Sequence, residues 1–362
     1  MRCASTRVET RFLDLCTWTY KHQGQSTKAK RSMKRQVSID VVICTYNNAV
    51  LLDATLDAVA RQLVSEDVDW QVLVVNNNCT DETSQVLEKH STRLPLRTVV
   101  ETTQGLTPAR VRGVRETSRE WIAFVDDDCL LEDNWIEQAA HFAGEHAECG
   151  AFGGQIIPRW EMTPPAFVLS RRYAFACKYH GETAHRRPWL AGAGLIVRRE
   201  ALVDCGWLDK QYLEDRKGGR LVSGGDMEIA LRVGSMYELW YNPECKLQHV
   251  IPARRMSREY VRGVTRGLGA SRHNADALKW SGSYAAWLPY SAALAVGFGV
   301  RGIVELARDA DLKLAFSPAL GWCSAMWEMF SMNAAKRREL LGCAAHREPH
   351  KNAMHLREER CS

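Results

Sequence analysis

Five consecutive apolar residues that run directly into three aspartates constrain this chain more than any other feature. The apolar run covers residues 121–125, and Asp126, Asp127 and Asp128 follow it at once. A short apolar run of this kind predicts a strand buried inside a parallel sheet. The helical apolar spacing of residues 132–142 predicts a helix directly behind it. We therefore expect the aspartates at the carboxyl end of a strand, where open α/β sheets bind their ligands.

Three neighbouring carboxylates repel one another, so a fold that keeps them must supply a cation. Carboxylate oxygens suit Mg²⁺ or Mn²⁺, which bind through one or two carboxylates together with the phosphates of a substrate. A solvated acidic turn is the alternative, because acidic clusters are common in loops. The three aspartates alone do not decide between these two interpretations.

Two strand-and-helix units precede the aspartates. Residues 37–45 and 70–75 are rich in β-branched residues and predict strands, and each is followed by a polar turn and a helical pattern. Residues 96–100 predict a third strand, and Pro108 stands at the start of another helix. Strands that alternate with helices predict an α/β fold with a doubly wound, mostly parallel sheet. The turns and the aspartates then share one edge of that sheet.

Composition limits the partners and the compartment. The net charge of +5 over 362 residues is too small to indicate a nucleic-acid polymer as partner. The twelve cysteines are scattered without C-x-x-C or zinc spacing, so we expect reduced thiols in the cytoplasm. Residues 1–36 are basic and lack the apolar core of a signal peptide, which predicts a disordered extension or a start at Met33. Residues 336–362 predict a disordered tail.

Four segments in register carry a resemblance to a known family. Residues 42–47, 74–81, 108–113 and 124–128 resemble, in this order, the motifs of the inverting family 2 glycosyltransferases. The resemblance spans residues 37–265 and implies the GT-A fold, a Rossmann-like, mostly parallel sheet flanked by helices. It also implies a nucleotide-sugar donor and a divalent metal, Mg²⁺ or Mn²⁺, held by a D-x-D motif.

The resemblance assigns the donor and metal sites residue by residue. The residues it places at the donor are Thr45, Tyr46, Asn47, Asn76, Asn78, Arg110, Asp126, Asp127, Gly192 and Gly194. Asn76 stands where the family usually has an aspartate that binds the base, so a UDP-sugar is the default donor and not a deduction. For Arg110 the alternative is an ordinary surface arginine, and Val111 departs from the family pattern. The metal ligands implied are Asp126, Asp128 and His249, and Arg255 is a weaker candidate for the diphosphate.

Asp226 is the candidate catalytic base. It begins an amphipathic helix and resembles the family aspartate that takes the proton of the acceptor hydroxyl. The alternative is that Asp226 merely caps the helix, and both roles are compatible. Gly225 replaces the usual glutamate, a departure for which Glu228 is the expected compensation.

Residues 266–335 predict a helical extension with two uncharged runs. These runs, 284–300 and 314–327, are each shorter than the roughly 20 residues of a spanning helix. They form either a hairpin in the membrane interface, with tryptophans at headgroup depth, or core helices over the catalytic domain. We favour peripheral association with the cytoplasmic face of the inner membrane, because lipid-linked acceptors are common in this family.

We therefore expect a metal-dependent inverting transferase, of the hexosyltransferase type, that moves a sugar from a nucleotide donor to a hydroxyl of a glycan or lipid-linked acceptor. Polysaccharide or lipid-linked glycan synthesis is what the family implies. A catalytically inactive membrane scaffold of the same fold is one alternative. A nucleotidyltransferase is another, but residues 45–48 lack the glycine-rich basic loop that it needs. Cys129 and Leu130 do not fit a haloacid-type phosphatase.

Overall fold

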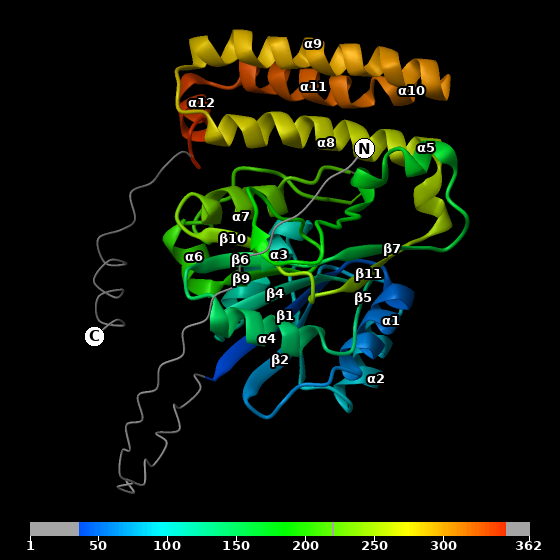
Figure 1. The fold of residues 1–362 in the computed structure, drawn as a ribbon, viewed down its shortest axis with the longest axis vertical. Helices are drawn as coiled ribbons and strands as arrows, with labels where there is room; N and C mark the ends of the chain where they lie inside the picture. The colour runs from blue at the N-terminus through cyan, green and yellow to red at the C-terminus, as the bar shows by residue number, and fades with distance from the viewer. Residues whose placement is uncertain (1–35, 219–220, 345–362) are drawn as a thin grey trace, which may run out of the picture. The chain divides into compact units, whose positions relative to one another are not determined.

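The computed structural model describes residues 36–218 and 221–344, and strands alternate with helices through its first half (Figure 1). The elements of this half are β1 (Val37–Thr45), α1 (Ala49–Ala60), β2 (Val68–Asn76), α2 (Thr83–Ser91), β3 (Leu96–Val100), α3 (Leu106–Arg115), β4 (Trp121–Asp126), β5 (Cys129–Leu131) and α4 (Trp135–Glu145). The order of strands and helices predicted up to the aspartates is therefore confirmed.

The later elements are shorter until the C-terminal helices begin. They are β6 (Cys149–Gly153), β7 (Ile156–Trp160), α5 (Ala166–Leu169), the 3-10 helix η1 (Arg172–Phe175), β8 (His185–Arg186), β9 (Leu195–Arg198), α6 (Arg199–Asp204), α7 (Gly225–Gly234), β10 (Glu238–Tyr241), β11 (Leu247–Ile251) and the 3-10 helix η2 (Ala253–Met256).

The main sheet has eight strands in the order β3-β2-β1-β4-β9-β6-β10-β8. Its first four strands are parallel, whereas β9 runs antiparallel to both β4 and β6. In this register Thr45 pairs with Asn76, and Cys44 pairs with Asp126. The carboxyl ends of β1, β2 and β4 therefore meet at one edge. A small second sheet, β5-β11-β7, brings β11 beside the segment that follows the aspartates.

The central strands carry continuous apolar runs, such as residues 41–44 and 121–125, because the sheet is covered on both faces. Val41 and Ile43 pack into one buried cluster with α1 and α4, and Val42 between them packs into another with α3. Successive side chains of a strand point to opposite faces, so a strand between two helical layers needs a continuous apolar run. This is why the run before Asp126 could be recognised as a strand.

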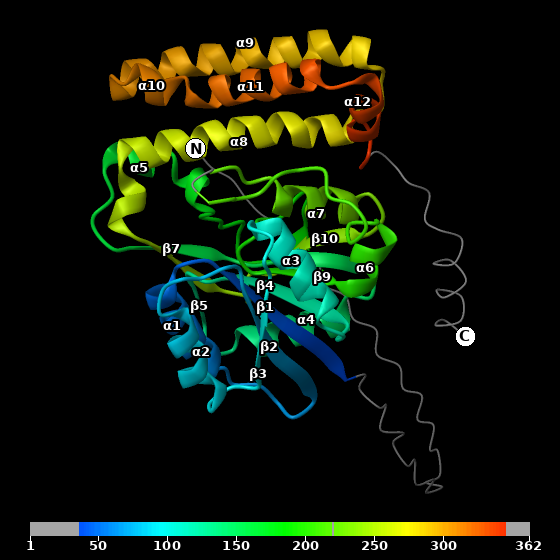
Figure 2. The ribbon, with the colours of Figure 1, turned by 180° about the vertical axis from the view of Figure 1, so that it is seen from behind.

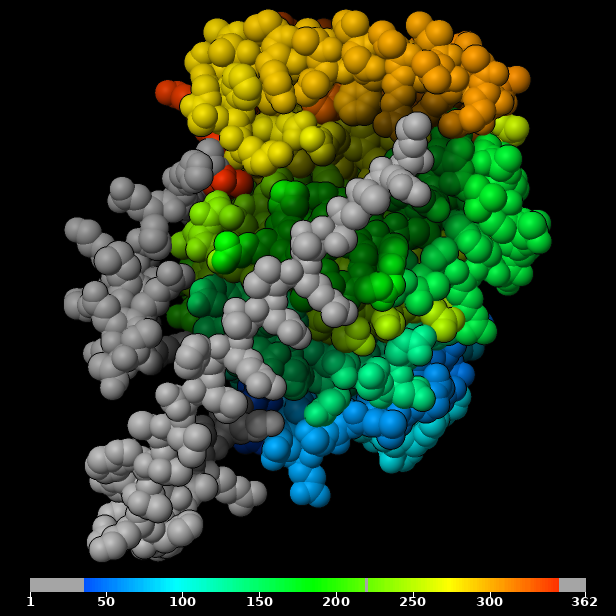
Figure 3. All heavy atoms as spheres, in the orientation of Figure 1, coloured from blue at the N-terminus to red at the C-terminus, as the bar shows by residue number. Residues whose placement is uncertain are grey.

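The C-terminal part is a set of helices that packs on the sheet domain. It consists of α8 (Arg258–Lys279), α9 (Tyr284–Asp309), α10 (Leu312–Ala315), α11 (Ser317–Ser331) and α12 (Ala334–Leu340). The long helices α8, α9 and α11 lie side by side in both ribbon views (Figures 1 and 2), and α8 also contacts α7. In the space-filling view their side chains, yellow to orange, stack on the green middle of the chain (Figure 3).

Two boundaries from the sequence differ from the structure. The expected domain boundary after residue 265 falls inside α8, which is one continuous helix. The expected tail from residue 336 is folded as far as Ala344, because α12 forms there and Leu340, Cys343 and Ala344 pack against Leu213. Residues 1–35 and 345–362 lie outside the described residues.

The nine cysteines of the described residues are all free, and five of them are buried. Burial raises the pKa of Cys245 well above its ordinary value and that of Cys149 to about 12, so that these thiols stay protonated. They act as small apolar side chains of the core.

Candidate active site

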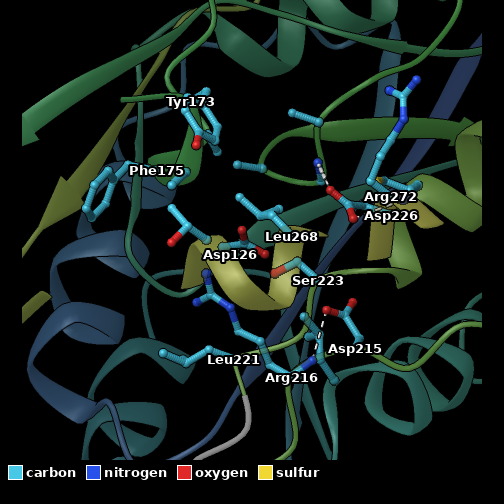
Figure 4. Close-up of a pocket in the computed structure, with 18 of the residues that line it drawn as sticks. Asp126, Tyr173, Phe175, Asp215, Arg216, Leu221, Ser223, Asp226, Leu268 and Arg272 are labelled. Carbon is cyan, nitrogen blue, oxygen red and sulfur yellow. Dashed lines mark hydrogen bonds between the residues drawn. The ribbon is translucent and has the colours of Figure 1, made fainter. Parts of the chain in front are cut away.

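One cavity of about 940 Å³ opens where β1 and β4 end, and it continues towards the C-terminal helices. The residues assigned from the sequence that line it are Thr45, Tyr46, Asn47, Arg110, Asp126, Asp127, Asp128, Gly192, Asp226 and His249. Figure 4 shows Asp126, Asp215 and Asp226 around this cavity. Motifs that lie far apart in the sequence therefore meet at one place.

Asp127 joins the turn after β1 to the turn after β4. Its carboxylate accepts hydrogen bonds from the Thr45 hydroxyl at 2.7 Å and from the side-chain amide of Asn48 at 2.8 Å. Burial and the charge of Asp128 raise the pKa of Asp127 to about 7. Because both oxygens already have protein donors, Asp127 shapes the wall of the cavity.

Asp128 is buried between two cationic side chains. Arg255 donates to one carboxylate oxygen at 2.6 Å, and Nε2 of His249 lies 3.4 Å from the other. Burial alone would raise the pKa of Asp128, but His249 and Arg255 hold it well below its usual range. Burial would likewise lower the pKa of His249, but the Asp128 carboxylate raises it above its ordinary value. Asp128 is therefore ionised at neutral pH.

Asp126 and Asp128 belong to a cluster of side chains that could hold a metal ion, and His249 lies beside Asp128. Ligand atoms of Asp126, Asp128 and Cys129 lie within 4.8 Å of one another. Nδ1 of His249 donates to the Phe175 carbonyl at 2.8 Å, because a carbonyl can only accept. Nε2 faces Asp128, and a neutral His249 would offer the lone pair of this nitrogen to a cation bound there. Burial and the neighbouring aspartates raise the pKa of Cys129, so its thiol is a poor ligand. Two carboxylates with an imidazole suit Mg²⁺ or Mn²⁺.

Arg110 is buried, and the alternative of a surface arginine is wrong. Its side chain is 5% exposed, and its guanidinium lies 3.0 Å from the carboxylate of Asp215 and 3.5 Å from that of Asp126. Phe124 supplies an aromatic face at 5.6 Å. Burial lowers the pKa of Arg110, but the charges of Asp215 and Asp126 outweigh burial and raise it. Arg110 is therefore a buried, charged residue that lines the cavity.

Asp226 lies in the first turn of α7 and faces the same cavity. Its oxygens accept hydrogen bonds from the backbone amides of Gly192 and Met227, each at 2.9 Å. Burial and the nearby charge of Asp215 raise the pKa of Asp226 to about 6. Gly224 occupies the N-cap position of the helix, so Asp226 is not the cap. A half-buried carboxylate with a raised pKa is typical of a general base.

Asn76 and Asn78 are not among the described residues that line the cavity. The Asn76 oxygen accepts from the backbone amide of Cys79 at 2.9 Å, and the Asn78 amide donates to the Thr102 carbonyl at 2.9 Å. Both side chains are used to form the turn after β2. The residue of this turn that does line the cavity is Asn77, which sequence reasoning missed. Three adjacent asparagines gave no signal by which to choose among them.

The two glycines expected beside the donor sugar differ in position. Gly192 lines the cavity, and a Cβ at this residue would lie 2.9 Å from the Cβ of Asp226. Its lack of a side chain allows the close approach of the two segments. Gly194 has a φ of +72°, and a Cβ there would lie 2.5 Å from Leu247 in the core. Gly194 therefore serves packing and the turn, while Gly192 serves the site.

Glu228 does not compensate for the missing glutamate at residue 225. It is fully buried, and its carboxylate accepts from the backbone amides of Tyr212 and Leu213. It also pairs with Arg232 at 2.8 Å. These contacts hold the segment before α7 and do not face the cavity, so the expectation for Glu228 is wrong.

Asp215, Lys178 and Trp189 also line the cavity and were not among the predicted site residues. Asp215 contacts Arg110, and the charged, glycine-rich stretch around it gave no signal for its role. Lys178 lies 4.7 Å above the ring of Trp189, and burial lowers the pKa of Lys178. Lys178 belongs to residues 159–188, a stretch rich in arginine, aromatic residues and proline.

Comparison with known proteins supports a glycosyltransferase. Residues 40–202 match the model of the family described as glycosyl transferase family 2. A mannosyltransferase, PcManGT from Pyrobaculum calidifontis, solved in complex with GDP-Man and Mn²⁺, aligns with a TM-score of 0.52 and 20% identity. The alignment covers 80% of this chain and 87% of that chain, and it shows the GT-A fold.

Two relatives of known class are similar in sequence. A PGL/p-HBAD biosynthesis glycosyltransferase of Mycobacterium bovis is 33% identical over 122 residues, which are 33% of this chain and 46% of the relative. Glycosyltransferase AglE of Haloferax volcanii is 28% identical over 199 residues, which are 54% of this chain and 60% of the relative. The chain thus spans about half the length of the relatives that it matches.

Proposed function

We propose that this protein is a metal-dependent inverting glycosyltransferase of the hexosyltransferase type. It moves a sugar from a nucleotide-diphosphate donor to a hydroxyl of an acceptor. The observation that carries the proposal is that Asp226, with its raised pKa, lines the same cavity as Asp126, Asp128 and His249. A base and a diphosphate site on opposite sides of one sugar are what an inverting transfer needs.

In the proposed mechanism the oxygen of the acceptor hydroxyl attacks the anomeric carbon of the donor sugar, and Asp226 accepts the proton of that hydroxyl. The bond from that carbon to the nucleoside diphosphate breaks on the opposite face, which inverts the configuration. The backbone amides of Gly192 and Met227 hold the Asp226 carboxylate in place for this step. Asp126, Asp128 and His249 would hold the cation, which when bound neutralises the charge that develops on the leaving diphosphate.

The donor pocket is proposed at the turns after β1 and β2. Tyr46 is 44% exposed and offers an aromatic face to a base. Because Asn76 uses its side-chain oxygen within its own turn, base selection would come from this ring and from backbone groups near Asn77. A UDP-sugar remains the default donor, and the GDP-Man bound by PcManGT adds GDP-sugars to the candidates.

A panel of UDP-, GDP- and dTDP-sugars, incubated with the protein and Mn²⁺ or Mg²⁺, tests the proposal. We expect the protein to hydrolyse at least one of these sugar nucleotides slowly, and we expect an excess of chelator to abolish this hydrolysis. Turnover that is unchanged by the chelator would contradict the metal site. Release of pyrophosphate from a nucleoside triphosphate and sugar phosphate would favour the nucleotidyltransferase instead. No turnover with any donor would favour the inactive scaffold.

We also propose that the acceptor is a glycan or lipid-linked glycan presented at a membrane surface. The helix α9, with 26 residues, is the one helix of the described residues that is long and apolar enough to cross a membrane. From the uncharged run 284–300 we expected a segment too short to span a membrane, and the helix formed there is longer. Tyr290 and Leu294 line the active-site cavity, while Val296 and Val300 of the same helix are 68% and 58% exposed.

Ion pairs favour a helix that lies on the membrane over one that crosses it. The buried Arg171 pairs with Glu305 at 2.7 Å and with Asp309 at 2.5 Å, and both carboxylates belong to the last turns of α9. These contacts fix α9 to the segment before η1, and insertion of the whole helix would break them. An interfacial helix keeps the ion pairs and covers the exposed valines with lipid. The proposed location is the cytoplasmic face of the inner membrane.

A further inference from the structure

The first residue of α7 leaves a space that a distant carboxylate fills. A Cβ at Gly225 would lie 2.5 Å from Oδ2 of Asp215 and 3.2 Å from Oγ1 of Thr107. The first of these distances is about that between the Cβ and a carboxylate oxygen of a single aspartate. Oδ2 of Asp215 therefore fills the space that a side chain at residue 225 would need, while its Cγ lies 3.2 Å from the Cβ position.

Asp215 is held firmly in this position. Its side chain is 4% exposed, Oδ2 accepts from the Arg110 guanidinium at 3.0 Å, and Oδ1 accepts from the backbone amide of Arg216 at 2.9 Å. A buried cation needs a fully committed partner, because an unpaired charge in the interior is strongly unfavourable. Asp215 is the nearer of the two carboxylates that Arg110 contacts, with Asp126 at 3.5 Å.

Arg110 also lies close to the candidate base. A Cβ on Gly192 would contact both the Asp226 side chain, at 2.9 Å, and Nη2 of Arg110, at 3.1 Å. The guanidinium is thus within reach of a third carboxylate. Without Asp215, Arg110 would keep only Asp126 at 3.5 Å and could turn towards Asp226, whose charge also acts on it. An ion pair with Asp226 would occupy the oxygens that must accept a proton.

We propose that Asp215 is a positioning residue of the transfer site: it occupies the place of a side chain at residue 225, holds Arg110, and so leaves the Asp226 carboxylate free for the acceptor hydroxyl. This inference rests on the proposed glycosyl transfer. The proposal explains why residue 225, beside the candidate base, can be a glycine. The carboxylate next to it comes from Asp215, in another segment, and not from Glu228.

Moving the carboxylate along the chain tests this proposal. We expect Asp215→Ala to lower kcat for sugar transfer or donor hydrolysis by about 100-fold, with the donor KM changed by less than about threefold, because the base is misplaced and not the donor. Adding Gly225→Asp to Asp215→Ala should restore kcat to within about tenfold of wild type. The matched control, Asp215→Ala with Gly225→Ala, fills the same space without a charge and should stay as slow as Asp215→Ala.

Several results would overturn the proposal. It fails if Asp215→Ala turns over like wild type, or if the two double variants are equally active. Asp215→Asn, which keeps the shape of the side chain, replaces Asp215→Ala should the latter not fold, and it too must be slow. If Gly225→Asp restores the turnover of Asp215→Ala and Gly225→Ala does not, the site needs a carboxylate at this point and not merely a filled space.

A measurement of stability separates this inference from the proposed function. The thermal midpoint of unfolding should fall in Asp215→Ala. It should recover when Gly225→Asp is added and stay low when Gly225→Ala is added, because only Gly225→Asp supplies a charge that neutralises Arg110. Should wild type turn over no donor, the proposed function fails, and the pattern of midpoints then decides whether the carboxylate can be exchanged. Equal midpoints in the two double variants overturn the exchange.

Discussion

Asp226→Asn separates the chemistry of the site from the stability of the fold, because the two respond in opposite directions. A general base contributes typically 10²–10⁴-fold to a rate, so we expect kcat to fall by about that factor. The donor should bind almost as before, since Asp226 lies on the acceptor side of the proposed site. Wild-type kcat/KM should rise with pH up to about 6, where the raised pKa places the deprotonation of Asp226.

The effect on stability follows from the same pKa. In the folded protein the pKa of Asp226 is raised from 3.8 to about 6, so the folded state binds the proton more tightly than the unfolded state. Well below pH 3.8 the carboxyl is protonated in both states and contributes nothing. As pH rises through these two pKa values wild type loses stability, and at about 1.4 kcal/mol per pKa unit the total loss is about 3 kcal/mol. Asparagine cannot ionise, so the variant lacks this loss.

Urea unfolding at pH 4 and pH 7, with pH–rate profiles alongside, measures both effects. We expect the stability of Asp226→Asn relative to wild type to improve by about 2 kcal/mol between the two pH values, because part of the total loss has already occurred at pH 4. The hydrogen bonds from Gly192 and Met227 to Asp226 are altered at both pH values and cancel in this comparison. Near-normal turnover by the variant, or a stability difference that does not change with pH, would refute the assignment.

Glu228→Gln is the matched control, two residues further along α7. Its buried carboxylate holds Arg232 and two backbone amides and does not line the cavity. We expect this variant to lose about 3 kcal/mol of stability, while the folded protein keeps its kcat. The two substitutions thus predict opposite patterns from neighbouring carboxylates.

Three further predictions concern the metal, the fold and the membrane. Asp128→Ala should abolish turnover and weaken Mn²⁺ binding measured by calorimetry, because it removes an ionised ligand; unchanged Mn²⁺ affinity would place the metal elsewhere. Arg171→Met should lower the free energy of unfolding by about 3–5 kcal/mol, because Glu305 and Asp309 lose their buried partner, and a loss below 1 kcal/mol in urea titration would contradict this. Val300→Asp with Val304→Asp should reduce flotation with anionic vesicles and leave donor hydrolysis unchanged, whereas unaltered flotation would remove α9 from the membrane contact.

The sequence by itself determined the first half of the fold and the position of the aspartates. A continuous apolar run is needed wherever a strand is buried on both faces, so residues 37–45 and 121–125 could be recognised as strands without tertiary information. Because the carboxyl ends of parallel strands share one edge of a sheet, Thr45 and Asp126 could be placed together as well. The order of apolar residues along the chain is enough to recognise these strands, because helices cover both faces of each strand along its length.

Only the tertiary structure decided which polar groups serve the site. Asp215 and Arg110 are 105 residues apart, and Arg255 and Asp128 are 127 apart, so no spacing in the sequence reveals their contacts. For the same reason Glu228 looked like a substitute for the missing glutamate, although the direction of its side chain on α7 turns it into the core. The extent of α9 was also decided by packing, because its last turns are fixed by Arg171 rather than by their own apolar pattern. Pairing of buried charges depends on distances in space, and these arise only when the sheet and the helices pack together.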